Sequence, residues 1–302
     1  EGAQRAMRAT YVREIGMLER NLELLANIGS TAPYVGLVGT VLFIKELAHV
    51  PQNWPLIAGA AVAAVVGFVL FVRRQRRMSE PLLEFSIFRN KAFTGGVLAA
   101  AFAMFTIAGA QLITTQRFQL VEGFSPLQAG LLVAAIALGA LPSGLLGAAF
   151  LDTLGLRLII SGGLGVGALG LLLSITAVAT DTFALLVAGF VVTGLGLGGA
   201  FSVASSAIMG NAHPRKAGMA ASVEEVSYEM GSLSAVAVLG SLLTFVYAFT
   251  VQLPNGSPDA ARESLADALA VADGNSEVIA AANTAFDTAY LVTMIVLGVV
   301  LA

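Results

Sequence analysis

Cysteine is absent from this 302-residue sequence, and charged residues are scarce. Without cysteine there is no disulfide framework and no thiolate metal site. Charged residues make up 12% of the chain and hydrophobic residues 57%, whereas a soluble domain has about 25% and about 45–50%. The formal net charge of -3 gives no electrostatic basis for binding nucleic acid. The composition therefore excludes an ordinary soluble domain and predicts an integral membrane protein.

Long apolar runs account for most of the sequence. A membrane-spanning helix needs about 20 mostly apolar residues, and runs of this length recur with short charged stretches between them. They are longer than the strands of a membrane barrel and do not alternate in polarity, which argues against strands. We therefore predict an all-α polytopic membrane bundle. The eight candidate spans are 31–47, which is short and weak, 55–72, 93–115, 127–150, 158–180, 183–210, 218–250 and 286–302.

Basic residues gather in alternate connections between these spans. If all eight spans cross the membrane, thirteen of the 16 basic residues lie on one side. The positive-inside rule makes that side cytoplasmic. Lys45, Arg117 and Arg262 fall on the other side. The predicted location is the inner (plasma) membrane, crossed many times.

The ends and connections differ in character from the spans. Residues 1–30 mix both charge signs with apolar positions at helical spacing, which predicts a cytoplasmic amphipathic helix. Residues 31–47 form the weak first span, and residues 48–302 carry the other spans. The loop 251–285 is acidic and is predicted to lie outside. Because the chain begins with Glu1 rather than Met and ends within an apolar run, we expect it to be a fragment.

Three glutamates in the first turns of the 218–250 span are the strongest candidates for chemistry. Glu225 and Glu229 are four residues apart and share a helix face, and Glu224 lies on a neighbouring face. A carboxylate inside a membrane is costly and indicates function by default. Such a carboxyl can hold a proton and lose it when a cation arrives. We predict proton coupling by Glu225 and Glu229, with Glu224 secondary; the alternative is that all three are solvated at the cytoplasmic interface.

Other kinds of site find little support in the sequence. Gly165, Gly167 and Gly170 match G-x-G-x-x-G, but they lie inside an apolar span with no strand before them, which excludes a dinucleotide site. Glycines in such a span indicate close helix packing instead. His49 and His213 are isolated and form no metal pair. We therefore expect no enzyme activity, no cofactor and no metal.

The stretch LERNLELLANIGSTAPYVGLVGTV, residues 18–41, resembles the ExbB/TolQ/MotA family of proton-channel motor subunits. Residues 29–33 (GSTAP) match the signature of that family, and Thr40 falls where the family places a channel-lining threonine. The resemblance implies a segment that leads from a cytoplasmic helix into a membrane helix. The family's next helix, which completes the channel wall, does not follow in this sequence.

Four later segments resemble the 14-helix drug:proton antiporters of the major facilitator superfamily. They are FIKELAHVPQNWPLI (43–57), EPLLEFSIFRNKAF (80–93), FQLVEGFSPLQAGLL (118–132) and KAGMAASVEEVSYEMGSLSAVAVLGS (216–241), in matching order and spacing. The resemblance covers about residues 42–302 and implies a half-bundle of that fold, the second half of a transporter. It also implies a proton-exchanging role for acidic residues of the 218–250 span. The family's first six helices are missing.

A short connection between the fourth and fifth spans has a weaker resemblance. Asp152, Gly155 and Arg157 are similar to the superfamily's Gly-x-x-x-Asp-Arg-x-Gly-Arg-Arg loop, in which the aspartate caps a helix and pairs with a basic group as the two halves rock. Ala148 and Thr153 replace residues of that motif. A gating loop is the functional interpretation, and a plain turn with a positive-inside arginine is the favoured one.

The two resemblances meet near Val41, where a natural fusion, an engineered chimera and a gene-assembly error each explain the junction. The favoured function is part of a proton-coupled multidrug efflux antiporter that exports lipophilic or cationic compounds by alternating access. The expected partners are the lipid bilayer, protons, small lipophilic or cationic substrates and a missing N-terminal half. The alternatives are a proton-channel motor subunit that energises a partner, and an inactive truncated product.

Overall fold

A computed structural model describes residues 38–39, 42, 54–75, 85–213 and 216–302. The chain divides into two units. The first holds residues 1–47 and 53–82, and the second holds residues 48–52 and 83–302. Within the first unit the structure describes helix α2, Trp54–Gln75, an apolar helix at the predicted 55–72 span. The predicted helix 1–30 and most of the 31–47 span lie outside the described residues.

The described part of the second unit is helical throughout its regular structure. Six of its helices are long and apolar enough to cross a membrane. The prediction of an all-α membrane bundle is therefore confirmed. These six helices are α3 (Lys91–Leu120), α4 (Pro126–Ala149), α5 (Leu151–Ala179), α6 (Phe183–Gly210), α7 (Ala217–Thr250) and α9 (Ser276–Leu301), and the short elements are η1 (Phe85–Arg89), η3 (Asp259–Arg262) and α8 (Leu265–Val271).

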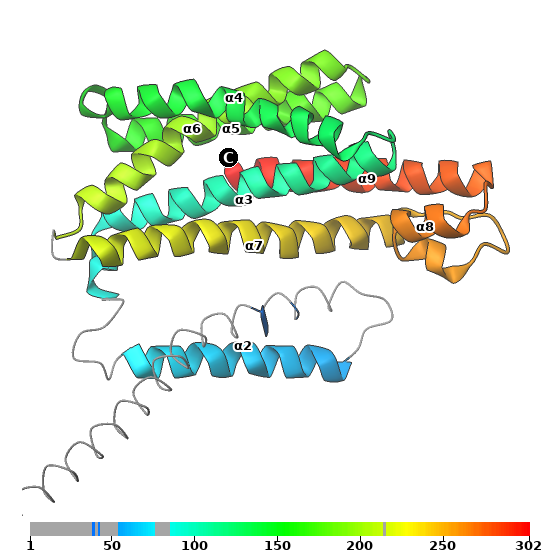
Figure 1. Cartoon of the computed structure of the whole chain (residues 1–302), viewed down its shortest axis with the longest axis horizontal. Coiled ribbons are helices and arrows are strands. Elements are labelled where there is room, and N and C mark those ends of the chain that lie inside the picture. The colour runs from blue at the N-terminus through cyan, green and yellow to red at the C-terminus, as the bar shows by residue number, and fades with distance from the viewer. Residues whose placement is uncertain (1–37, 40–41, 43–53, 76–84, 214–215) are drawn as a thin grey trace, which may run out of the picture. The chain divides into compact units, whose positions relative to one another are not determined.

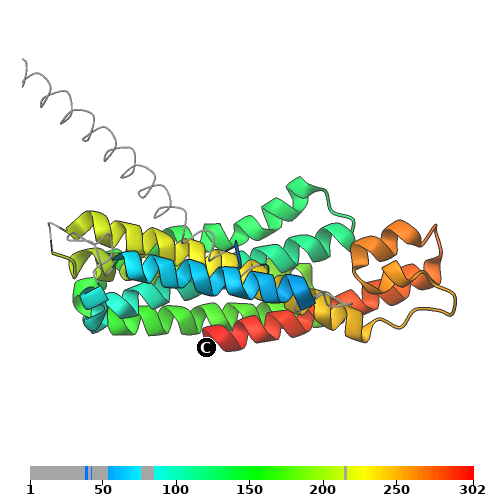
Figure 2. The ribbon, with the colours of Figure 1, turned by 90° about the horizontal axis from the view of Figure 1, so that it is seen from below.

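The six long helices form two groups of three. Helix α6 packs against α4 and α5, while α3, α7 and α9 pack against one another, and α3 with α6 and α5 with α9 join the groups. Figure 1 shows α3 and α7 running in the same direction and α9 running back in the opposite direction. We call the end where α3 and α7 begin the Lys91 end, and the opposite end, where α8 lies, the α8 end (Figures 1 and 2).

Glycines bring α6 into backbone contact with its neighbours. A Cβ atom added at Gly194 would lie 1.9 Å from the carbonyl oxygen of Ile136 on α4. One added at Gly196 would lie 2.3 Å from the carbonyl oxygen of Gly163 on α5. Lipid tails are as apolar as leucine, so membrane helices associate through close packing, which small residues allow. These contacts fix α4, α5 and α6 as one layer.

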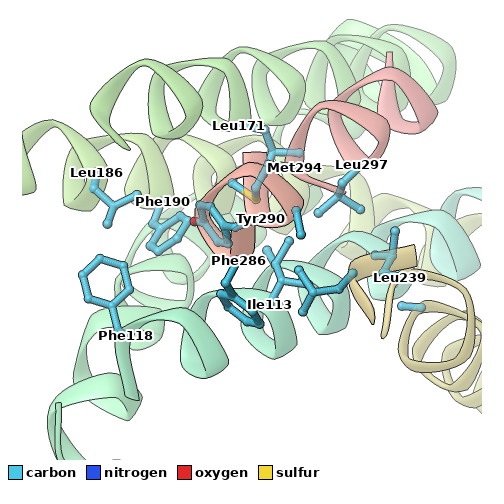
Figure 3. Close-up of a cluster of buried hydrophobic side chains, with 14 of the residues drawn as sticks. Ile113, Phe118, Leu171, Leu186, Phe190, Leu239, Phe286, Tyr290, Met294 and Leu297 are labelled. Atoms are coloured by element: carbon cyan, nitrogen blue, oxygen red, sulfur yellow. The ribbon is translucent and has the colours of Figure 1, made fainter. Parts of the chain in front are cut away.

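The core lies between the two groups of helices. Tyr290 and Phe190 are fully buried there, and so is Ile113. Figure 3 shows these side chains interleaved with Leu171 and Met294. Because α3, α5, α6, α7 and α9 all contribute to this cluster, it holds the two groups together.

Capping residues move two helix starts away from the hydropathy prediction. Helix α9 begins at Ser276, ten residues before the predicted 286, because the side chain of Asn275 accepts hydrogen bonds from the backbone N–H groups of Glu277 (3.0 Å) and Val278 (3.4 Å). Its first turns contain too many polar residues for the hydropathy pattern to include them in the predicted span. Helix α3 is capped in the same way by Asn90.

The connection between α7 and α9 folds back onto the bundle at the α8 end. The Tyr247 hydroxyl on α7 donates a hydrogen bond to the carbonyl oxygen of Ala261 in η3, at 2.9 Å. Ser264 caps α8 by accepting from the N–H of Asp267. Ala261 and Leu265 are buried, so this connection is packed rather than loose.

Candidate functional site

The three candidate glutamates lie in the third and fourth turns of α7. A helix of 34 residues is about 51 Å long, whereas the hydrocarbon core of a bilayer is about 30 Å thick. If α7 is centred in the membrane, about seven residues project at each end. Glu224 and Glu225 then lie at the edge of the hydrocarbon, and Glu229 lies more than one turn inside it.

Glu224 is held in place by an aromatic neighbour. It is half-buried, and the hydroxyl of Tyr228, one turn further along α7, donates a hydrogen bond to its Oε1. The Tyr228 ring stacks on Phe201 of α6, with ring centroids 4.5 Å apart and planes 18° apart. The α6 helix thus fixes Tyr228, and Tyr228 fixes Glu224.

Glu225 and Glu229 are placed differently. Both are exposed, and both lie on the face of α7 that the six-helix unit leaves uncovered. Within the described residues neither carboxylate has a hydrogen-bond or ion-pair partner. A carboxylate on an uncovered face of a membrane helix needs a polar surrounding, either water or another part of the protein.

The predicted gating residues do not form a separate loop. Asp152, Gly155 and Arg157 all lie in the first two turns of α5, which starts at Leu151 rather than at the predicted 158. The helix is kinked at Gly155, whose φ of 76° and ψ of 155° suit glycine. Asp152 and Arg157 are exposed, and in the described part of the chain neither forms an ion pair. The structure shows a kinked helix start here and leaves the gating interpretation untested.

The remaining candidate, Thr40, lies outside the described residues. The same holds for nearly all of residues 18–41, which carry the motor-subunit resemblance. Among the residues that the structure describes, no group of three or more histidine, cysteine or acidic side chains is placed to hold a metal ion.

An ion pair between two of the long helices was not predicted from the sequence. Arg117 was assigned to an outer connection, but α3 continues to Leu120 and buries the arginine, which pairs with Asp287 of α9. A signal was present: an arginine directly after one predicted span and an aspartate at the start of another, both assigned to the same side. Hydropathy alone does not show that these two residues meet.

A cavity of about 420 Å³ lies at the α8 end between α3, α7, α8 and α9. Its polar lining includes the side chains of Gln116, Gln119 and Thr244 and of Ser264 at the α8 cap. Its apolar lining includes Phe286. The cavity has uncharged walls, so it can accept polar groups without providing a fixed charge.

Six helices that are long and apolar enough to cross a membrane, and that pack closely through glycines, define a polytopic membrane bundle. Residues 25–233 of the chain match the Major Facilitator Superfamily. The chain belongs to this superfamily. The match begins within residues 18–41, so it includes most of the segment that resembles the motor subunits.

Curated relatives of the chain are efflux and resistance proteins. The multidrug efflux pump LfrA of Mycolicibacterium smegmatis is 33% identical over 272 residues, which cover 84% of this chain and 53% of that protein. The methyl viologen resistance protein SmvA of Salmonella typhimurium is 31% identical over 194 residues, 62% of this chain and 38% of that protein. The quinolone resistance protein NorB of Staphylococcus aureus is 30% identical over 185 residues, 61% and 40%. The chain spans about half, or less, of the length of these relatives.

Proposed function

We propose that this chain is part of a proton-coupled multidrug efflux antiporter that exports lipophilic or cationic compounds, with Glu225 and Glu229 as the proton-exchanging carboxylates. One observation carries the proposal: α7, a helix long enough to span the membrane, presents two carboxylates on a face that the six-helix unit leaves uncovered, and neither has a partner among the described residues. One relative named as a multidrug efflux pump and another named as a methyl viologen resistance protein support the substrate class.

The spacing of the two carboxylates suits exchange of a proton for a cation. Four residues apart on a helix, Glu225 and Glu229 repel each other when both are charged. A proton or a cationic substrate relieves this repulsion equally well, so the two compete for the same site. Antiport requires such mutually exclusive binding, because the proton must leave before the substrate enters and return after it departs. Glu224, already bonded to Tyr228, is secondary in this scheme.

Alternating access requires a second body for the six-helix unit to rock against. In this superfamily the substrate site lies at the interface of two halves, each built from two three-helix repeats. The uncovered face of α7 is the surface that we propose to meet the other half. The relatives' greater length is consistent with a second half that this chain does not include.

The charges at the two ends of the bundle support an orientation in the inner membrane in which the Lys91 end faces the cytoplasm. Described basic residues at the Lys91 end include Arg89, Lys91, Arg157 and Lys216. The α8 end is acidic, with Glu122, Asp181, Asp259, Glu263, Asp267, Asp273, Glu277 and Asp287 against Arg117 and Arg262. By the positive-inside rule the Lys91 end faces the cytoplasm. Glu225 and Glu229 then lie toward the cytoplasmic side, where substrate is taken up.

The first test substitutes the two carboxylates in the complete reading frame, expressed in a drug-sensitive strain. Glu225→Gln and Glu229→Gln each remove a charge without changing shape. We expect each to slow proton-driven efflux of a cationic dye at least about tenfold, equivalent to ~1.4 kcal/mol. Glu277→Gln, at an exposed acid on α9, is the matched control and is expected to pump normally. Normal efflux by both α7 variants, at equal membrane abundance, would contradict the assignment.

The second test asks whether one six-helix unit suffices. We expect the 302-residue chain alone to give no drug resistance, because a site between two halves is incomplete with one of them. Growth of the sensitive strain at graded drug concentrations measures this. Resistance conferred by the chain alone would show that a second half is not needed.

The motor-subunit alternative depends on residues 18–41 alone. The superfamily match takes in residues 25–41 of that stretch, which favours reading it as transporter sequence. The alternative makes a separate prediction, co-purification with a single-span partner protein, which the antiporter does not require.

A further inference from the structure

A buried arginine links the ends of two membrane helices at the α8 end. Arg117 Nε lies 2.8 Å from Asp287 Oδ1 on α9, and its Nη1 lies 3.2 Å from Glu122 Oε1 in the turn after α3. The guanidinium also lies over the rings of Phe118 and Tyr290, 5.1 and 5.6 Å from their centroids. Figure 3 shows the Phe118 ring at one side of the buried cluster and Tyr290 near its middle.

The two acidic partners of Arg117 differ in what they connect. The Arg117 side chain is 10% exposed, whereas those of Asp287 and Glu122 are 38% and 40% exposed, so protons from solvent can reach both carboxylates. Glu122 follows Arg117 by five residues, and their pair is local. Asp287 is on another helix, and its pair with Arg117 joins α3 to α9. Arginine stays charged at any physiological pH, so it always needs at least one of these anions.

The other ionisable side chains at this end lie on α9 and on the elements packed against it. Each of them either has a hydrogen-bond partner outside the Arg117 cluster or is exposed. The Tyr290 hydroxyl on α9 lies 3.3 Å from the hydroxyl of Thr114 on α3. On α7 the Tyr247 hydroxyl bonds to Ala261, and on α8 the Asp267 carboxylate accepts from the Ser264 hydroxyl. The remaining charged side chains at this end are exposed: Asp181 after α5, Asp259, Arg262 and Glu263 in and after η3, Asp273 after α8, and Glu277 at the start of α9.

We propose that Asp287 is a proton-binding site whose charge decides whether Arg117 ties α3 to α9. When Asp287 is charged, Arg117 bridges the two helices. When Asp287 binds a proton, Arg117 keeps its charge partner in Glu122, and the link between the helices is lost. Because Arg117 always keeps one anion, the switch avoids the free-energy cost of leaving a buried charge without a partner.

This site is separate from the α7 carboxylates and does not depend on the proposed drug export. It lies at the opposite end of the bundle, the end that the charge distribution places outside. Arg117 acts as a positioning residue, and Asp287 is the group that takes the proton. Acid on that side loosens α9 from α3, and removal of the proton restores the bridge.

The absence of cysteine makes a direct distance measurement possible. Cysteines introduced at the exposed positions Gln119 on α3 and Thr284 on α9 carry spin labels, and pulsed electron paramagnetic resonance reads the distance between them in lipid nanodiscs. The purified full chain is measured from about pH 8 to about pH 3, a range that includes the ordinary pKa of an aspartate side chain, about 3.9. We expect a single narrow distance at high pH and a longer or broader distribution at low pH.

Variants separate a proton switch from a plain structural contact. Asp287→Asn is expected to show the low-pH distribution at every pH, and Asp287→Glu to keep the transition. Glu122→Gln removes the competing anion, so Arg117 holds Asp287 more firmly and the midpoint moves to lower pH. Glu277→Gln, a matched acid outside the cluster, is expected to leave the midpoint unchanged. A distance that does not respond to pH, or a midpoint that Glu122→Gln leaves in place, would overturn the proposal, even if Asp287→Asn fails to fold.

Discussion

The two ends of the second unit hold their acidic side chains in opposite ways. At the α8 end, Asp287 and Glu122 flank a buried arginine at 2.8 and 3.2 Å. Toward the Lys91 end, Glu225 and Glu229 are exposed and, within the described residues, have no partner. A buried cation requires its anions for stability, whereas an unpaired carboxylate on a membrane helix requires water or a mobile cation. The first arrangement stabilises the fold, and the second leaves charge available for exchange.

The largest expected effect on stability is the loss of Arg117. Arg117→Leu removes the cation and leaves two like charges near each other beside the core. Breaking a buried pair costs about 3–5 kcal/mol, and because both carboxylates are partly exposed we expect about 1–3 kcal/mol here. Unfolding of the purified chain by denaturing detergent measures this. Arg262→Leu, an exposed arginine at the same end, is expected to change stability by less than about 0.5 kcal/mol; equal effects of the two variants would refute the difference.

A smaller effect is expected at the Glu224–Tyr228 pair. Tyr228→Phe removes the hydroxyl but keeps the ring on Phe201, so it should cost about 0.5–1.5 kcal/mol, the net value of one hydrogen bond. A double-mutant cycle with Glu224→Ala isolates the coupling between the two side chains. Additive effects in that cycle would show that the hydrogen bond contributes nothing to stability.

The smallest effect is expected at the two exposed carboxylates. Glu225→Gln and Glu229→Gln should change the free energy of unfolding by less than about 0.5 kcal/mol, since neither side chain has a partner among the residues that the structure describes. The same variants are expected to lose efflux, so activity and stability separate at this end. A stability loss as large as that of Arg117→Leu would mean that these glutamates hold the fold together, and the comparison between the two ends would fail.

Several features of the fold were predictable because they depend on local composition. Apolar runs long enough for a bilayer predicted every long helix of the second unit. Helix starts were less predictable, because caps such as Asn275 act through a few hydrogen bonds that a hydropathy window averages away. The start of α5 depends on one glycine, Gly155, whose backbone angles allow the helix to begin before a kink.

The candidate site was predictable only in part. Glu224, Glu225 and Glu229 stand out in the sequence because charge is rare in a spanning helix. Which of them is held by a neighbour is not evident there, since the stacking of Tyr228 on Phe201 joins residues from different helices. The partner of Arg117 lies 170 residues away along the chain, beyond the reach of any local pattern.

The sequence by itself determined that this protein is a bundle of membrane helices and where along α7 its acidic residues fall, and its charge pattern is the basis on which we predict the direction of the bundle. These properties follow from transfer of each residue between water and lipid, which depends on the residue and its near neighbours. Only the tertiary structure decided which acids are paired and which are open. That choice depends on the packing of α6 against α7 and of α3 against α9, and such contacts form between segments that the sequence keeps far apart.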